Sequence, residues 1–291
     1  PSPFHYHAPN SLTEALELLA AFGGDAKPLA GGQSLVPMLA LRLARPEHLV
    51  DLNGVTELDS VQAIDGLLRI GSMTRQFVVG ADSTVADQVP LLTLATPYIG
   101  HFQIRNRGTV GGSVAHADPS AEYPTVVMAL DAQLEVTSSR GTREIGASEF
   151  FEGPLMTALE PDELLTAIRF PVWASRSGFS FREVSRRHGD FALVGAAVGI
   201  ELDEGTTIRR AAIALLGVEG QPRRAFDAEA ALVGTATSAV DTGEMGRLAL
   251  ESLRANDDIH ASAEYRRRVG AHLVSQAVEE ACRRASEADG G

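Results

Sequence analysis

The chain has 291 residues, of which 44% are hydrophobic and 22% charged, as in ordinary globular proteins. Its length allows one large domain or two to three smaller ones around separate cores. A formal net charge of −13 argues against nucleic acid or an anionic membrane as a partner, because both favour a basic surface. The single cysteine, Cys282, excludes a disulfide framework and an iron–sulfur cluster ligated by this chain alone, and it predicts a cytoplasmic location.

Membrane, export and metal-binding segments are not expected. No apolar run approaches the roughly 18 residues of a membrane helix, and the longest one, 191–200, is interrupted by glycines. The first residues lack the basic and apolar regions of a signal peptide. His5 and His7 alternate with aromatic residues, which is typical of a surface strand, so no metal site is predicted.

The first predicted helix begins at a capping box. Ser11 and Glu14 have the required spacing, and four apolar residues share one helical face: Leu12, Ala15, Leu16 and Leu19. Gly23 and Gly24 predict the helix end, because glycine tolerates the left-handed conformation of a C-cap. Strand 28–30, helix 35–43 and strand 48–52 follow in alternation. The pattern predicts an N-terminal α/β domain over residues 1–55.

The middle of the chain mixes strands with few helices. The predicted elements, in chain order, are strand 67–73, helix 85–99, strand 133–137 and strand 164–170. They predict a second, α+β domain over residues 56–173. Residues 174–178, Ala-Ser-Arg-Ser-Gly, have the composition of a linker.

The remaining residues, 178–291, predict a C-terminal domain of three antiparallel strands and a helical bundle. The strands are expected at 179–184, 192–202 and 208–218. The longest helix is expected over 261–285, because four apolar residues form one row along it: Val269, Leu273, Ala277 and Ala281.

Two glycine segments are the candidates for binding chemistry. Segment 30–34 reads Ala-Gly-Gly-Gln-Ser between a strand and a helix, and segment 108–113 reads Gly-Thr-Val-Gly-Gly-Ser. Glycine permits positive φ and lets a ligand approach the backbone, where successive amides can bind an anion. Ser34 and Thr109 add hydroxyl groups. Neither segment has the Rossmann or P-loop spacing, so the residues alone leave open both plain turns and a phosphate site.

At these residues the chain resembles a known family, the FAD-binding medium subunits of molybdenum hydroxylases. That family includes subunits of carbon monoxide dehydrogenase and quinoline 2-oxidoreductase and the flavin domain of xanthine dehydrogenase. The resemblance extends over essentially the whole chain and rests on separated motifs in the same order: Phe4-His5-Tyr6, the segments 30–35 and 45–52, segment 107–113, Ala115-His116-Ala117-Asp118-Pro119-Ser120-Ala121-Glu122, and 186–192.

The resemblance implies an α+β fold. Two subdomains of the vanillyl-alcohol oxidase type would clamp FAD, and a C-terminal domain of three antiparallel strands and helices would follow. It also implies that both glycine segments bind the FAD diphosphate through backbone amides. The implied cofactor-binding residues of the two segments are Ala30, Gly31, Gly32, Gln33, Ser34, Leu35, Thr109, Val110, Gly111, Gly112 and Ser113.

Three further residues are implied to contact FAD. Glu122 stands where the family usually has Asp, which accepts hydrogen bonds from ribityl hydroxyls. Leu165 matches an apolar residue that packs on the flavin. Phe191 matches a position that carries Tyr in some relatives, over the isoalloxazine face. His116 and Asp118 look like an acid–base pair, but the resemblance makes their segment structural, so no catalytic residue and no metal ligand is predicted.

The implied function is electron relay. A large subunit with the molybdopterin cofactor would hydroxylate the substrate, and a small subunit with [2Fe–2S] clusters would pass electrons to the FAD of this chain. The flavin would then reduce an external acceptor, in a dimer of heterotrimers. Two alternatives stay open: a free-standing flavin-dependent oxidoreductase of the related fold, and a non-catalytic scaffold. The sequence does not identify the substrate or the acceptor.

Overall fold

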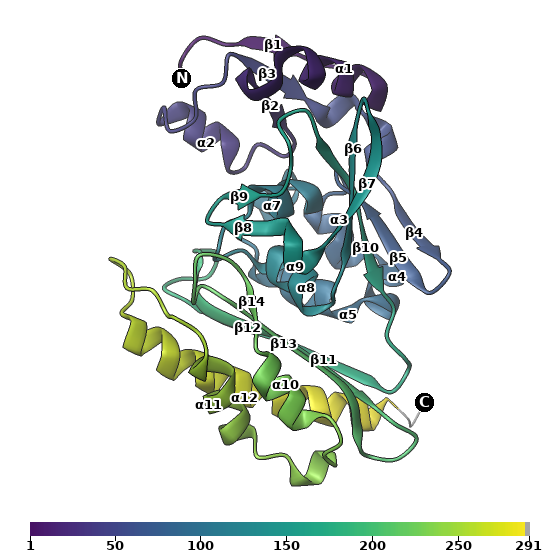
Figure 1. Ribbon diagram of the computed structural model, residues 1–291, viewed down its shortest axis with the longest axis vertical. Coiled ribbons are helices and arrows are strands. Elements are labelled where there is room, and N and C mark those ends of the chain that lie inside the picture. Colours follow the sequence, from purple (N-terminus) through teal and green to yellow (C-terminus); the bar gives the residue numbers. More distant parts are fainter. Residues whose placement is uncertain (289–291) are drawn as a thin grey trace.

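The computed structural model describes residues 1–288, so the last three residues of the predicted C-terminal domain lie outside the described residues. Three sheets follow one another along the long axis of the molecule in chain order, with a small two-stranded sheet beside them (Figure 1). Helices and strands are mixed throughout. Within residues 1–288, no helix is both long and apolar enough to cross a membrane.

The N-terminal unit is a parallel sheet with the order β1-β3-β2, in which His5 lies opposite His48. Helix α1 begins at Ser11, whose Oγ accepts the Glu14 amide at 3.2 Å, and it ends at Gly23 with φ +50°. The predicted helix and both of its ends are thus confirmed. The elements of this unit are β1 (His5–His7), α1 (Leu12–Phe22), β2 (Ala26–Leu29), α2 (Leu35–Ala40) and β3 (His48–Asp51).

Helix α2 is shorter than predicted. It ends at Ala40 rather than at residue 43, and Arg42 then takes a left-handed φ of +59°. The core under this unit combines α1 and β3 with Met73 and Leu164 from the middle of the chain. The first 55 residues therefore share their core with the following segment, where a separate core was the simplest expectation.

The middle unit is an antiparallel sheet with the order β4-β5-β10-β6-β7. Its strands are β4 (Val61–Ile64), β5 (Leu67–Gly71), β6 (Gln133–Ser138), β7 (Gly141–Gly146) and β10 (Leu164–Pro171), and β8 (Phe151–Gly153) pairs with β9 (Met156–Thr157). Its helices are α3 (Gln76–Ala81), α4 (Ser83–Gln88), α5 (Pro90–Ala95), α6 (Phe102–Arg105), α7 (Val110–His116), α8 (Glu122–Ala129) and α9 (Ala147–Phe150).

The prediction of a single helix over residues 85–99 was wrong. Helices α4 and α5 are separated at Val89, which has φ −136° and ψ 66°. Val89 precedes Pro90, and a residue before proline is disfavoured in the helical conformation. Pro90 itself lacks an amide donor and begins the next helix. The remaining residues, Thr96–Tyr98, form a 3₁₀ turn.

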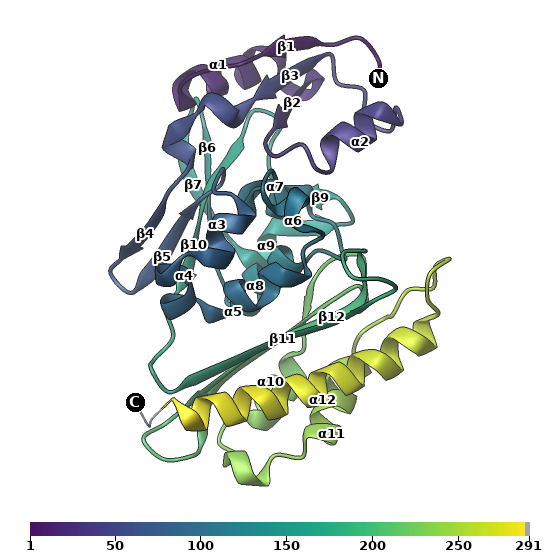
Figure 2. The same ribbon diagram turned by 180° about the vertical axis from the view of Figure 1, so that it is seen from behind.

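The C-terminal unit has three long antiparallel strands, as predicted, and a short fourth one: β11 (Ser177–Ser185), β12 (Ala192–Leu202), β13 (Ile208–Leu216) and β14 (Arg223–Arg224). Its helices are α10 (Phe226–Leu232), α11 (Thr242–Glu251) and α12 (Ala263–Glu287). Figure 2 shows α12 running across the sheet. Every residue of β12 is buried, because α12 covers one face and α5 and α8 contact the other side. The predicted apolar row of α12 is confirmed at Leu273, Ala277 and Ala281.

Candidate functional site

The two glycine segments touch each other through their backbones. A Cβ on Gly31 would lie 2.3 Å from the carbonyl oxygen of Arg107 and 2.8 Å from Cα of Gly108. A Cβ on Gly112 would lie 3.3 Å from Cβ of Ala30. Both figures show the same arrangement, with the chain between β2 and α2 descending onto α7 (Figure 1, Figure 2). Glycine at position 31 is therefore needed for the close approach of the two backbones.

The first glycine segment has backbone amide donors that are not paired within the described protein. Among the described residues, no protein acceptor is found for the amides of residues 31–35. Gly32 has φ +74°, as expected for a glycine turn, and Ser34 begins α2 without a side-chain cap. Gln33 folds back so that its Nε2 donates to the Gly31 carbonyl at 3.1 Å. A run of unpaired amides is an anion-binding arrangement.

The second glycine segment differs from the prediction, because it is the first turn of α7 rather than an open loop. The amide of Val110 donates to the Thr74 carbonyl at 3.0 Å, and that of Gly111 donates to the Ser72 carbonyl at 2.9 Å. Thr109 caps the helix, with its Oγ1 accepting the Gly112 amide at 3.0 Å. The amide of Ser113 donates to Thr109 at 3.1 Å. The amides of residues 110–113 therefore have acceptors inside the protein in this structure.

The glycines of the second segment serve close packing instead. A Cβ on Gly111 would lie 2.3 Å from Cβ and 2.7 Å from Cα of Ser72, at the end of β5. Neither Gly111 nor Gly112 has a positive φ. Position 111 thus holds α7 against the middle sheet, and position 112 leaves space for the first segment.

Glu122 is a buried acid at the start of α8. Its side chain is 8% exposed, and among the described residues it makes no hydrogen bond or ion pair with another side chain. Burial raises the pKa of Glu122 to about 7, and the nearby Asp118 carboxylate adds to the shift. A carboxyl group that is partly protonated near neutral pH can both donate and accept a hydrogen bond.

Glu183 on β11 is a second buried acid that sequence reasoning missed. Its Oε2 is buried and has no hydrogen-bond partner within the described part of the chain. Burial raises the pKa of Glu183 to about 8, and repulsion from the Glu122 carboxylate contributes to the increase. No motif surrounds Glu183 in the sequence, so only the packing of β11 reveals it.

Leu165 and Phe191 lie in contrasting surroundings. Leu165 is 5% exposed in the main core, at a register irregularity of β10 between Leu165 and Ala167. Phe191, between β11 and β12, is 68% exposed, so its ring is available for contact with another group. The preceding loop packs on His101, since a Cβ on Gly189 would lie 2.6 Å from the imidazole.

The pair His116 and Asp118 does not form a hydrogen bond with each other in the described structure. Asp118 Oδ1 accepts the Ser120 amide at 2.8 Å and so stabilises a turn. Burial lowers the pKa of His116.

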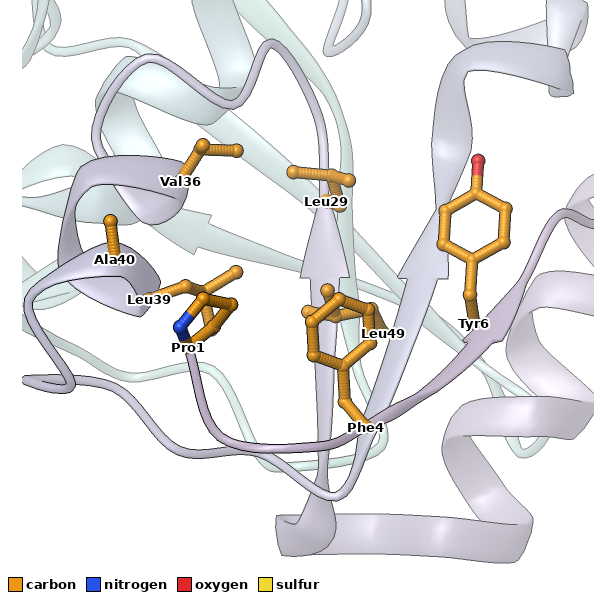
Figure 3. A pocket seen from close by; sticks show the side chains of 8 residues that line it. All are labelled: Pro1, Phe4, Tyr6, Leu29, Val36, Leu39, Ala40 and Leu49. Atoms are coloured by element: carbon orange, nitrogen blue, oxygen red, sulfur yellow. The ribbon is translucent and has the colours of Figure 1, made fainter.

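An apolar pocket of roughly 280 Å³ borders the first glycine segment (Figure 3). The side chains of Leu29 and Val36 lie 3.5 Å and 3.1 Å from the place of the missing Cβ of Gly32. The other lining residues are Pro1, Phe4, Tyr6, Leu39, Ala40 and Leu49. The lining includes none of residues 30–34, so the pocket flanks the first glycine segment without containing its unpaired amides.

Comparison with known proteins gives the family. Residues 2–173 match the family model of the FAD binding domain in molybdopterin dehydrogenase. The chain belongs to this family of FAD-binding flavoprotein subunits. Residues 179–281 match the CO dehydrogenase flavoprotein C-terminal domain. This member of the family is thus a flavoprotein subunit of a molybdenum-containing dehydrogenase or hydroxylase.

Relatives of known activity support the same family over their full length. The chain is 40% identical to the 6-hydroxypseudooxynicotine dehydrogenase complex subunit alpha of Paenarthrobacter nicotinovorans, covering 98% of this chain and 96% of the relative. It is 37% identical to the carbon monoxide dehydrogenase medium chain of Afipia carboxidovorans, covering 98% and 99%.

Solved structures of the family have the same fold as this flavoprotein subunit. The structure of carbon monoxide dehydrogenase from Hydrogenophaga pseudoflava superposes with a TM-score of 0.94 at 37% identity, covering 98% of this chain and 99% of that one. Quinoline 2-oxidoreductase from Pseudomonas putida 86 gives a TM-score of 0.92 at 39% identity, covering 98% of both chains.

Proposed function

We propose that the FAD diphosphate binds to the amides of residues 31–35, and that the flavin relays electrons within a molybdenum hydroxylase complex. The observation that carries this proposal is the run of amides without protein acceptors at the contact between the two glycine segments. Buried backbone donors in folded proteins are almost always paired, and Gly31 is buried, so a ligand acceptor is expected at its amide. Diphosphate oxygens can be held by backbone amides without lysine, which suits a chain with a net charge of −13.

The fold gives each part of the chain a role in this proposal. Residues 1–55 and 56–173 form the two FAD-binding subdomains of the vanillyl-alcohol oxidase type, and residues 178–291 form a C-terminal domain. One sheet of three or more strands lies within each of the first two ranges, and the four-stranded sheet begins at Ser177, one residue before the third, which supports the division.

The remaining site residues either support the first segment or contact the cofactor at other points. Thr109, Val110, Gly111, Gly112 and Ser113 form a rigid wall behind the first segment, because their hydrogen bonds fix α7 in place. Glu122 exchanges hydrogen bonds with the ribityl hydroxyls, while Leu165 and Phe191 contact the ring system. The bound FAD supplies the redox chemistry, and the protein binds it, orients it and shields it from water.

Partner chains complete the electron path in this proposal. Electrons arrive from [2Fe–2S] clusters in a small subunit, and a large subunit carries the molybdopterin cofactor. One cysteine in 291 residues cannot ligate such clusters, and the first two relatives are named as a complex subunit and a medium chain. A dimer of heterotrimers in the cytoplasm and reduction of an external acceptor belong to the same proposal.

Purification tests the proposal directly. The full chain should co-purify with a cysteine-rich iron–sulfur chain and a large molybdenum chain, and the complex should carry one FAD per copy of this chain. Acid precipitation should release the flavin, since no covalent attachment is proposed. A complex without flavin would support the scaffold alternative, and full activity of this polypeptide alone would support the free-standing oxidoreductase.

A further inference from the structure

Two side chains outside the glycine segments hold the carbonyls beside them. Asn53 Nδ2 donates to the Ala30 carbonyl at 3.0 Å, and Arg75 Nη1 donates to the Arg107 carbonyl. Arg75 Nη2 also donates to Asn53 Oδ1, at 2.6 Å. The Asn53–Arg75 pair thus forms a continuous hydrogen-bonded bridge from the first glycine segment to the second.

The N-terminal sheet anchors one end of this bridge. Asp51, at the end of β3, accepts the Asn53 amide at 2.9 Å and the Tyr6 hydroxyl at 2.5 Å. The Asn53 side-chain amide also donates to Asp51. Hydrogen bonding to the Tyr6 hydroxyl and to Asn53 lowers the pKa of Asp51 in spite of its partial burial, so it remains a charged acceptor.

The second glycine segment anchors the other end. Arg75 lies opposite Thr109 in an isolated antiparallel bridge. On either side of it, the Gln76 amide donates to the Gly108 carbonyl at 2.9 Å and the Thr74 carbonyl accepts the Val110 amide at 3.0 Å. The backbone of Arg75 is therefore fixed to the second segment, and its guanidinium reaches back to the first.

The bridge also sets the direction of an unpaired amide. A trans peptide is planar, so its C=O and N–H point in opposite directions. Because the Ala30 carbonyl points to Asn53, the Gly31 N–H must point away from the bridge. That amide is the first of the run without protein acceptors.

We infer that Asn53 and Arg75 are positioning residues for the cofactor, which fix the two glycine segments and aim the amides of the first at the bound diphosphate. This inference rests on the proposed FAD site. It adds two residues whose role is to position the glycine segments, not to attract the diphosphate by charge. Without the bridge, the first segment must be ordered by the ligand, and the cost of that ordering reduces affinity.

Charge alone is the competing explanation, because a second guanidinium stands nearby. Burial lowers the pKa of Arg75, and the positive charge of Arg107 lowers it further, although an arginine stays charged in either case. Arg107 is exposed. Lysine separates the two explanations, since it keeps the charge but cannot present the fork of two donors that joins Asn53 to the Arg107 carbonyl.

The test measures FAD affinity in the complex of this chain with its partners, after flavin removal and retitration, for Arg75→Lys, Asn53→Ala and the double variant. Each single variant should bind FAD about tenfold more weakly, and the double variant should be little weaker than either, because both changes break one bridge. The melting temperature of the flavin-free complex should change little.

Arg69→Lys is the matched control, since it disrupts a half-buried ion pair with Glu135 in the middle sheet, away from the glycine segments. It should leave FAD affinity unchanged. Wild-type affinity in Arg75→Lys, or fully additive losses in the double variant, would overturn the bridge. Failure of the wild-type complex to bind FAD would instead refute the proposed function and not the bridge in particular.

Discussion

The two glycine segments look alike in the sequence but perform different tasks in the structure. The amides of residues 31–35 have no protein acceptor among the described residues, whereas those of residues 110–113 are all used inside the protein. Gly31 lies against the backbone of the second segment, and Gly111 lies against Ser72. A glycine pair can therefore either offer its amides to a ligand or permit close packing. The two roles differ in whether the amides have acceptors within the protein.

The first segment should therefore determine most of the affinity for FAD, and the second should keep the backbone around the site rigid. A flexible binding segment loses conformational freedom when the ligand binds, and a fixed wall reduces that cost. The fixed α7, with its cap at Thr109, is such a wall. Substitutions in the two segments should therefore separate loss of FAD from loss of stability.

Gly31→Ala should have the largest effect, because it acts on both segments at once. The added methyl would lie 2.3 Å from the Arg107 carbonyl, so one backbone must move. We expect FAD affinity to fall at least about a hundredfold, equivalent to roughly 3 kcal/mol, together with a lower melting temperature. Gly24→Ala is the control, since nothing lies within 4 Å of that position. Unchanged FAD affinity in Gly31→Ala would break the assignment of the first segment.

Substitutions at Gly112 and Gly111 should separate the two effects. In Gly112→Val the added Cβ meets Thr109 Oγ1 at 2.7 Å and Ala30 Cβ at 3.3 Å, so it displaces the first segment. FAD affinity should fall on the order of a hundredfold with a modest change in melting temperature.

In Gly111→Ala the methyl meets Ser72, and the free energy of unfolding should fall by about 2–3 kcal/mol with or without FAD. Equal profiles for the two variants would contradict the comparison.

Much of the fold followed from the sequence, because its local signals agree with the tertiary structure. The capping box at Ser11, the C-cap at Gly23 and the apolar row of α12 each depend on nearby residues only. The helix over 85–99 was mispredicted because apolar periodicity concealed the effect of Pro90. The shared core was missed because Met73 and Leu164 reach it from distant parts of the chain.

The candidate site could be located from the sequence but not explained by it. The glycine segments were evident, and resemblance supplied the cofactor. Whether an amide is free depends on partners such as Ser72 and Thr74, which have no motif of their own. Asn53 and Arg75 were missed for the same reason, since they contact each other across 22 positions of the chain. Glu183 was missed because its burial depends on the packing of β11.

The smallest expected effect is a pH dependence at Glu122, which lies beyond the second segment at the start of α8. The first segment binds through amides, which do not titrate. Burial raises the pKa of Glu122 from 4.5 to about 7 in the folded state. The folded protein then binds more protons than the unfolded chain between these values, so this group's contribution to stability is present below pH 4.5 and lost as the pH rises to about 7. Glu183, with its pKa raised to about 8, acts with the same sign.

Glu122→Gln isolates this contribution, because glutamine resembles the protonated acid at every pH. Its free energy of unfolding, from urea titrations of the flavin-free protein, should match wild type at pH 4 and exceed it by roughly 1–3 kcal/mol at pH 8. The difference between the two proteins is needed, because burial lowers the pKa of His116 and gives a pH dependence of the opposite sign. Glu149→Gln, on the exposed side of α9, serves as the control for loss of a charge. Parallel pH profiles for wild type and Glu122→Gln would mean that burial does not raise the pKa of this carboxyl, and that α8 begins at a charged group rather than at a partly protonated one.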